Sequence, residues 1–130
     1  MIEFHLDPAS GVATYLQLVQ QVHRALRLGL LEPGDRLPTA QQVVASLAIN
    51  PNTVLKAYRD LEREGLVRAR PGLGTFVVGQ LPRTDPAAQA RFRRSMDAWL
   101  RSAREAGLSP EEIDAIYRAA VRASAEEGVA

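Results

Sequence analysis

The chain has 130 residues, of which 46% are hydrophobic and 24% charged, a composition that excludes a disordered chain and fits one small domain, or a small domain with an appendage. Its 16 basic and 15 acidic residues leave a net charge of +1, so a surface for nucleic acid would depend on where the cations lie and not on their number. The lack of cysteine excludes disulfides and thiolate chemistry, and interrupted apolar runs with no signal-like N-terminus lead us to expect a cytoplasmic protein.

The first part of the chain predicts two helices. Residues 1–12 are expected to form an extended lead-in that closes with a turn, and residues 13–30 an amphipathic helix with apolar residues three and four positions apart. The residues of this stripe are Leu16, Val19, Val22, His23, Leu26 and Leu30. A second helix is predicted from Thr39 to about Leu47, because Thr39 and Gln42 form a capping-box pattern before an apolar run.

A third predicted helix follows almost at once. Asn50 is a good N-cap because its side chain accepts a hydrogen bond from a free backbone N–H, and Pro51 fits the first helical position, where no N–H is needed. The helix is expected to run to Glu64. Gly65 then suits the left-handed residue that follows many helices.

Two short strands are predicted after this helix, over residues 66–70 and 75–78. The loop between them, residues 71–74, contains two glycines and is compact enough for a hairpin. Three helices followed by a hairpin is the order of a winged helix-turn-helix. We therefore expect a mainly α fold with a small β-hairpin, and a winged helix-turn-helix domain over residues 1–80.

A proline-containing linker, residues 80–85, leads into two more predicted helices. The first begins at Pro86 and ends near Gly107. The second follows Ser109, which forms another capping-box pattern with Glu112.

The third predicted helix is the candidate for contact with nucleic acid. In a helix-turn-helix the second helix of the pair enters the major groove and its N-terminal turns reach base edges. Its inward face is expected to be Val54, Ala57, Tyr58 and Leu61, which leaves Asn52, Thr53, Lys56, Arg59 and Arg63 outside. Asparagine can bind an adenine edge, and threonine and lysine can bind bases or phosphates. Arg59 and Arg63 also fit a solvated face of mixed charge, and Asn50 and Pro51 fit a purely structural cap.

Other candidates lie before the second helix and in the hairpin. Phosphate contacts in such domains set register and affinity, whereas base contacts set sequence preference. The candidates for backbone contact are Arg36, Thr39, Gln41, Arg68, Arg70, Gly72 and Gly74. The two glycines also have a plain explanation, since the hairpin needs them for its geometry.

These motifs, in this order and spacing, resemble the GntR family of bacterial transcription regulators. The resemblance lies in residues 37–39, 50–62, 64–67 and 72–77. The wording Asn-Pro-Asn-Thr-Val at residue 50 and the short two-helix tail are most similar to the YtrA subfamily.

The resemblance implies a homodimer that binds double-stranded DNA at a palindromic operator, usually as a repressor and often of a nearby transporter operon. The DNA contacts that it carries over are Arg36, Thr39, Asn52, Thr53, Lys56, Arg70, Gly72 and Gly74. Many members have arginine where this chain has Gln41, Leu55 and Leu73. The operator is therefore expected to differ, and affinity for non-specific DNA to be lower.

The tail, residues 81–130, is expected to be a linker and a dimerisation or effector segment. Its two helices carry more apolar surface than one pair can bury, which indicates a second copy as partner. The residues expected in that interface are Phe92, Met96, Trp99, Leu100, Ile113, Ile116 and Tyr117. The alternative is that they pack on the winged domain of their own chain. A small-molecule effector, unidentified, would have to bind at the dimer interface or against the winged domain, because two helices cannot enclose a ligand-sized cavity.

An enzyme is not expected, because the chain has no cysteine and only two histidines, His5 and His23, far apart in the sequence. His23 lies near the apolar stripe of its helix, which favours a core or interface role over catalysis. No metal or cofactor is expected. A third hypothesis is a winged helix that binds protein instead of specific DNA, as the near-neutral charge allows. A DNA-binding protein is distinguished from it by a steep loss of affinity with salt.

Overall fold

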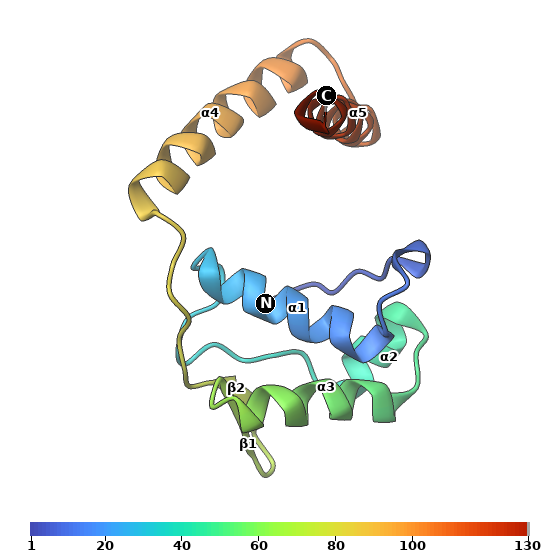
Figure 1. Cartoon of the computed structure of the whole chain (residues 1–130), viewed down its shortest axis with the longest axis vertical. Coiled ribbons are helices and arrows are strands. Elements are labelled where there is room, and N and C mark those ends of the chain that lie inside the picture. Colours follow the sequence, from blue (N-terminus) through green and yellow to red (C-terminus); the bar gives the residue numbers. More distant parts are fainter. Residues whose placement is uncertain (130) are drawn as a thin grey trace. The chain divides into compact units, whose positions relative to one another are not determined.

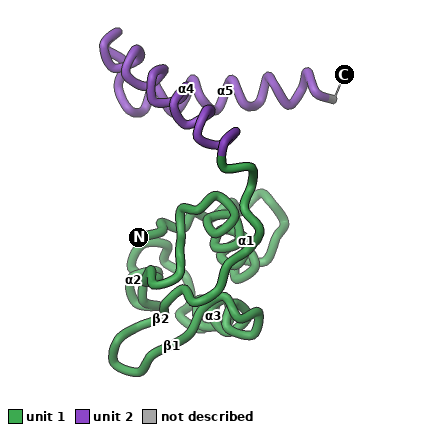
Figure 2. Tube along the Cα trace, turned by 90° about the vertical axis from the view of Figure 1, so that its left-hand side faces the viewer, with its two compact units in different colours: residues 1–86 green, residues 87–130 purple. Residues whose placement is uncertain are grey.

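The computed structural model describes residues 1–129, which form two compact units, Met1–Pro86 and the segment from Ala87 onward (Figures 1 and 2). Figure 2 colours the first unit green and the second purple. The elements are η1 (Pro8–Ser10), α1 (Thr14–Arg27), α2 (Ala40–Leu47), α3 (Pro51–Arg63), β1 (Val67–Arg70), β2 (Gly74–Val77), α4 (Pro86–Glu105) and α5 (Pro110–Val129). Within residues 1–129, no helix combines the length and the apolar content that crossing a membrane requires.

Helix α1 packs against α3 in the first unit, and it is shorter than the sequence pattern predicts. Val19, Val22 and Leu26 of the predicted stripe are buried, but Leu16 is exposed and Leu18 is buried instead. The predicted extension to Leu30 is wrong. Gly29 takes a left-handed φ of 69°, and the N–H of Leu30 turns back to the Ala25 carbonyl at 2.8 Å, so the Leu30 side chain points to solvent.

Helices α2 and α3 begin where their caps predict. The Thr39 hydroxyl accepts a hydrogen bond from the Gln42 N–H at 3.1 Å, and the Gln42 side chain accepts one from the Thr39 N–H at 2.8 Å. Asn50 caps α3 by accepting from the Asn52 N–H at 2.8 Å. These caps satisfy backbone donors that have no partner inside the helix. They confirm the predicted starts and define the orientation in which α3 leaves the turn.

The core of the first unit lies between α1, α2, α3 and the hairpin. Its fully buried side chains include Leu18, Val22, Leu37, Val54, Leu61, Val67 and Val77. Tyr58 on α3 is buried with them, and its hydroxyl donates to the Pro38 carbonyl at 2.6 Å. Burial raises the pKa of Tyr58 above that of a free tyrosine. This hydrogen bond joins α3 to the segment that leads into α2, so the two helices of the motif are fixed to each other.

The hairpin is the wing of the domain. Strands β1 and β2 are antiparallel, with Val67 opposite Val77 and Arg70 opposite Gly74. A third extended segment joins them, because Arg36 forms an isolated bridge with Phe76 and the Leu37 N–H donates to the Thr75 carbonyl. The expected winged helix-turn-helix is therefore confirmed, and the residues just before α2 belong to its wing.

The linker after the wing packs on the first unit. Leu81 is half-buried against the core, the Arg83 guanidinium donates to the Leu28 carbonyl, and the Thr84 N–H donates to the Arg27 carbonyl at 3.1 Å. These residues of the linker therefore belong to the first compact unit, which extends to Pro86.

The second unit consists of α4 and α5, joined at a turn. The predicted capping box is present, since the Ser109 hydroxyl accepts from the Glu112 N–H at 3.1 Å and the Glu112 carboxylate accepts from the Ser109 N–H at 2.9 Å. Ala103 on α4 is buried. Several large apolar side chains of this unit are exposed, namely Phe92, Met96, Trp99, Ile116, Tyr117 and Val121.

Candidate nucleic-acid interface

Helix α3 presents two chemically different faces. Val54, Ala57, Tyr58 and Leu61 are buried, as the spacing predicts. The opposite face exposes polar and basic side chains, Asn52, Lys56, Arg59 and Arg63, with Thr53 half-buried at its edge. A helix with one apolar face in a core and one basic face in water suits insertion into a groove lined by phosphates.

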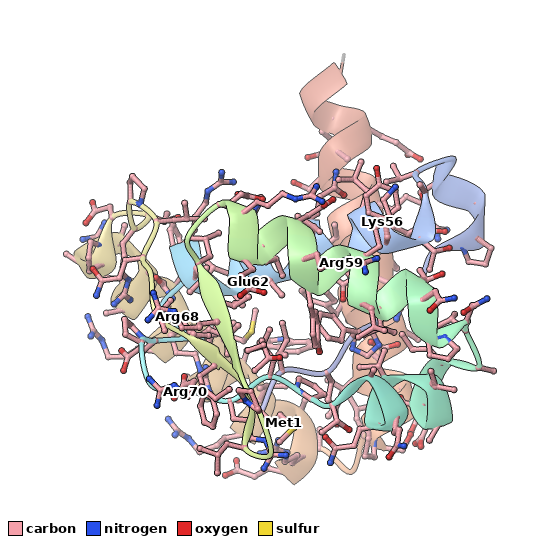
Figure 3. All side chains as sticks on the ribbon, turned by 90° about the horizontal axis from the view of Figure 1, so that it is seen from below. Met1, Lys56, Arg59, Glu62, Arg68 and Arg70 are labelled. Atoms are coloured by element: carbon pink, nitrogen blue, oxygen red, sulfur yellow. The ribbon has the colours of Figure 1, made fainter. Side chains whose placement is uncertain are left out.

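Figure 3 looks onto the face that α3 and the wing share. Lys56 and Arg59 lie along α3, and Arg68 and Arg70 lie along the neighbouring strand β1. In this view Glu62 lies between the two basic groups, and its side chain is exposed. Glu62 is one of the acids that give the surroundings of Arg59 and Arg63 a mixed charge, and it interrupts the positive surface at its middle.

The wing brings two distant arginines together. Arg36 lies beside β2, and Arg70 lies opposite Gly74 in the hairpin register. Gly74 has a φ of 125°, so its conformation favours glycine, and an added Cβ atom would lie 2.9 Å from the Arg36 Nε and would push that side chain aside. The Arg70 guanidinium stacks 5.3 Å from the centre of the Phe76 ring. Both arginines are exposed, at an edge where they can reach a DNA backbone.

Thr39 and Gln41 lie at the start of α2. The Thr39 hydroxyl accepts the capping hydrogen bond, yet a hydroxyl also has a proton to donate, so a phosphate can still be bound. Gln41, the second residue of the helix, is exposed. Thr39 can therefore cap the helix and bind DNA at the same time.

Lys56 contacts Tyr15, a neighbour that the sequence pattern does not predict. Its ammonium nitrogen lies 4.1 Å from the centre of the Tyr15 ring on α1. Sequence spacing alone does not pair these residues, because they belong to helices that meet only in the folded domain. The sequence offers one indication of a contact at Tyr15. This residue lies at the start of the apolar stripe, where one side of its ring is expected to stay accessible.

His23 has a structural role, in keeping with its expected place at the edge of the core. Its Nε2 lies 2.8 Å from the Glu64 carboxylate, which joins α1 to the end of α3. Within residues 1–129, no three histidine or carboxylate side chains gather where they might hold a metal ion. Two open hollows of about 410 and 370 Å³ lie beside the end of α1 and the linker. They have the volume of a small-ligand site, and Arg83 lines the larger one.

Comparison with known proteins places this arrangement in a family. Residues 14–77 match the family of bacterial regulatory proteins called gntR. The chain is 34% identical, over 105 residues, to the uncharacterized HTH-type transcriptional regulator YhcF of Bacillus subtilis, and the match covers 80% of this chain and 86% of YhcF. The chain belongs to the GntR family. It is therefore a DNA-binding transcription regulator and not an enzyme.

Two further relatives of this GntR protein bear on its function. It is 40% identical over 72 residues to the HTH-type transcriptional repressor YtrA of Bacillus subtilis, a match that spans 55% of each chain. This agrees with the predicted likeness to the YtrA subfamily. The DNA-binding domain of AraR, solved in complex with operator ORX1, has a TM-score of 0.51 and 26% identity, and the match covers 58% of this chain and 93% of that domain.

Proposed function

We propose that this GntR protein is a homodimeric repressor that acts in the cytoplasm. It binds a palindromic operator and represses a nearby transporter operon. The observation that carries the proposal is the continuous face made by the exposed side of α3 and the wing, on which Lys56, Arg59, Arg68 and Arg70 lie together. The repressor role is supported by the likeness to YtrA, and operator binding by the likeness to the AraR domain.

The residues divide into two tasks on this proposal. Asn52, Thr53 and Lys56, in the first turns of α3, enter the major groove and contact base edges. The other candidates contact the backbone and hold the domain in register: Arg36, Thr39, Gln41, Arg59, Arg70, Gly72 and Gly74. Backbone contacts give affinity for any DNA, and the first group gives preference for one sequence.

The exposed apolar side chains of α4 and α5 support a dimer. Phe92, Trp99 and Tyr117 are 71%, 38% and 48% exposed, which is unusual for aromatic residues without a partner. A second copy would bury them in a two-fold interface, together with Met96, Leu100, Ile113 and Ile116. Two recognition helices would then meet two half-sites about one turn of DNA apart, roughly 34–36 Å.

The test is binding of the purified protein to the DNA upstream of its own gene. We expect a footprint over an inverted repeat, and an affinity that falls with salt in proportion to the phosphates contacted. Lys56→Ala and Thr53→Ala should weaken this binding without changing the fold or the dimer. A flat salt response and no preference for any inverted repeat would favour a winged helix that binds protein.

A further inference from the structure

Lys56 is the single lysine of the chain, since the other basic residues are arginines. Its side chain is exposed on α3, and its ammonium lies over the Tyr15 ring at 4.1 Å from the ring centre. Tyr15, in the first turn of α1, is half-buried and packs against the core. The ring is therefore the fixed member of the pair, and the lysine is the member that it holds.

The contact is attractive but weak. A cation over the face of an aromatic ring is drawn to it by the ring quadrupole, and at an exposed site this changes an equilibrium by a factor of about two to five. A charged hydrogen bond to a base or a phosphate is stronger. The ammonium carries three N–H donors, so Lys56 can bind a base or a phosphate with its outward N–H groups while its charge stays above the ring.

The contact also restricts a flexible side chain. A free lysine has four rotatable side-chain bonds, and fixing them on binding has an entropic cost. Among the described residues Lys56 has no ion-pair partner, so Tyr15 is the group that limits its positions. A lysine held near the groove-facing side of α3 before DNA arrives has less freedom to lose.

We propose that Tyr15 is a positioning residue of the DNA-binding surface, which holds Lys56 in the conformation from which Lys56 contacts the operator. This inference rests on the proposed function. It assigns a role to the aromatic ring of Tyr15 and none to its hydroxyl. An arginine in place of Lys56 would make a different contact with the Tyr15 ring, because arginine stacks flat on a ring whereas an ammonium acts as a point charge.

A double-mutant cycle tests the proposal. Operator affinity is measured for the wild type, Tyr15→Leu, Lys56→Met and the double variant, with Tyr15→Phe as the conservative control. Tyr15→Leu should weaken binding about two- to five-fold when Lys56 is present. It should have no further effect when residue 56 is methionine. Tyr15→Phe should bind like the wild type, because the ring is kept.

A second measurement reads the contact without DNA. The ring current of Tyr15 should shift the NMR signals of the Lys56 Hε protons upfield, and a single lysine makes those signals unambiguous. The shift should persist in Tyr15→Phe and disappear in Tyr15→Leu. Equal thermal unfolding midpoints for the two variants would show that the fold is kept; if Tyr15→Leu unfolds, Tyr15→Met replaces it in the cycle.

The outcomes separate the inference from the function on which it rests. If the wild type binds its operator and Lys56→Met weakens that binding, but Tyr15→Leu acts equally in both backgrounds, only the positioning role is overturned. Tighter binding by Tyr15→Leu would also overturn it, since the ring would then restrain Lys56 from DNA. If Lys56→Met binds as the wild type does, both the proposed base contacts of α3 and the positioning role of Tyr15 are overturned.

Discussion

At the scale of single residues, the DNA-binding face depends on the placement of a few charges. The whole chain has a net charge of +1, yet Lys56, Arg59, Arg68 and Arg70 share one face. Glu62 lies among them and lowers the positive potential at the centre. We therefore expect such a face to bind arbitrary DNA weakly and base contacts to supply more of the operator affinity.

Removal of the Glu62 charge should therefore strengthen non-specific binding. For Glu62→Gln we expect about a fivefold gain per protomer in affinity for random duplex DNA at low salt, the effect of one close charge pair in water, about 1 kcal/mol. The gain should shrink at high salt because the charge is exposed. Glu126→Gln, on an exposed turn of α5, is the matched control. Equal affinities for the two variants would place Glu62 away from DNA.

Leu55 offers a second test on the same helix. It is 44% exposed on α3, between the basic residues, and an apolar side chain there can contact a thymine methyl group. Leu55→Arg should raise affinity for non-specific DNA and reduce the preference for the native operator. Competition binding with operator and random duplexes measures both. An unchanged ratio of the two affinities would show that residue 55 does not face a base.

At the scale of the elements, the starts of the helices follow from local signals and their ends and contacts do not. Thr39, Asn50 and Ser109 cap their helices as the sequence predicts, because a cap needs only residues two or three positions away. Helix α1 ends before the predicted position, because Leu30 continues the apolar spacing but Gly29 turns the chain. The pairing of Arg36 with Phe76 joins residues far apart in the sequence, and no local sequence pattern predicts it.

The hydrogen bond between Tyr58 and Pro38 holds the motif together. Tyr58→Phe should lower the free energy of unfolding by about 1–3 kcal/mol, since it leaves a buried carbonyl without its donor. Urea unfolding at neutral pH measures the loss. Tyr117→Phe, at a half-exposed ring of α5, is the control and should unfold as the wild type does. An equal loss in both variants would contradict the role of the buried bond.

The same residue gives the domain a pH dependence. Burial raises the pKa of Tyr58 in the folded state, so above about pH 10 the unfolded chain releases this proton while the folded chain keeps it. The contribution is therefore complete below pH 10 and declines as the pH rises toward the folded-state pKa. Stability measured from pH 8 to 11 should fall more steeply in the wild type than in Tyr58→Phe. Parallel curves would contradict this assignment.

At the scale of the whole molecule, the wing and α3 make the winged domain recognisable from sequence, whereas the tail is recognisable only as two amphipathic helices. The motifs in residues 37–77 carry the family, because helix caps, the turn glycines and the apolar spacing are all local. The tail shows exposed aromatic residues, and its capping box at Ser109 marks a helix start without indicating a family. The role of the exposed aromatic surface of the tail therefore depends on which protein surface covers it.

Trp99→Ala should therefore weaken the dimer, because a large aromatic side chain is lost from the proposed interface. Sedimentation equilibrium should show at least a tenfold weaker dimer, about 1.4 kcal/mol. Val78→Ala, which removes an exposed apolar side chain of the first unit, should leave the dimer unchanged. A Trp99→Ala protein that remains as dimeric as the wild type would place the interface elsewhere.

The most direct test of the DNA-binding account is the salt dependence of binding to the promoter of this protein's own gene, compared between the wild type and Arg36→Gln. The logarithm of wild-type affinity should fall linearly with the logarithm of the salt concentration. The Arg36→Gln slope should be smaller by about two per dimer, one phosphate contact in each protomer. A slope near zero in the wild type, or equal slopes in the two proteins, would contradict the account.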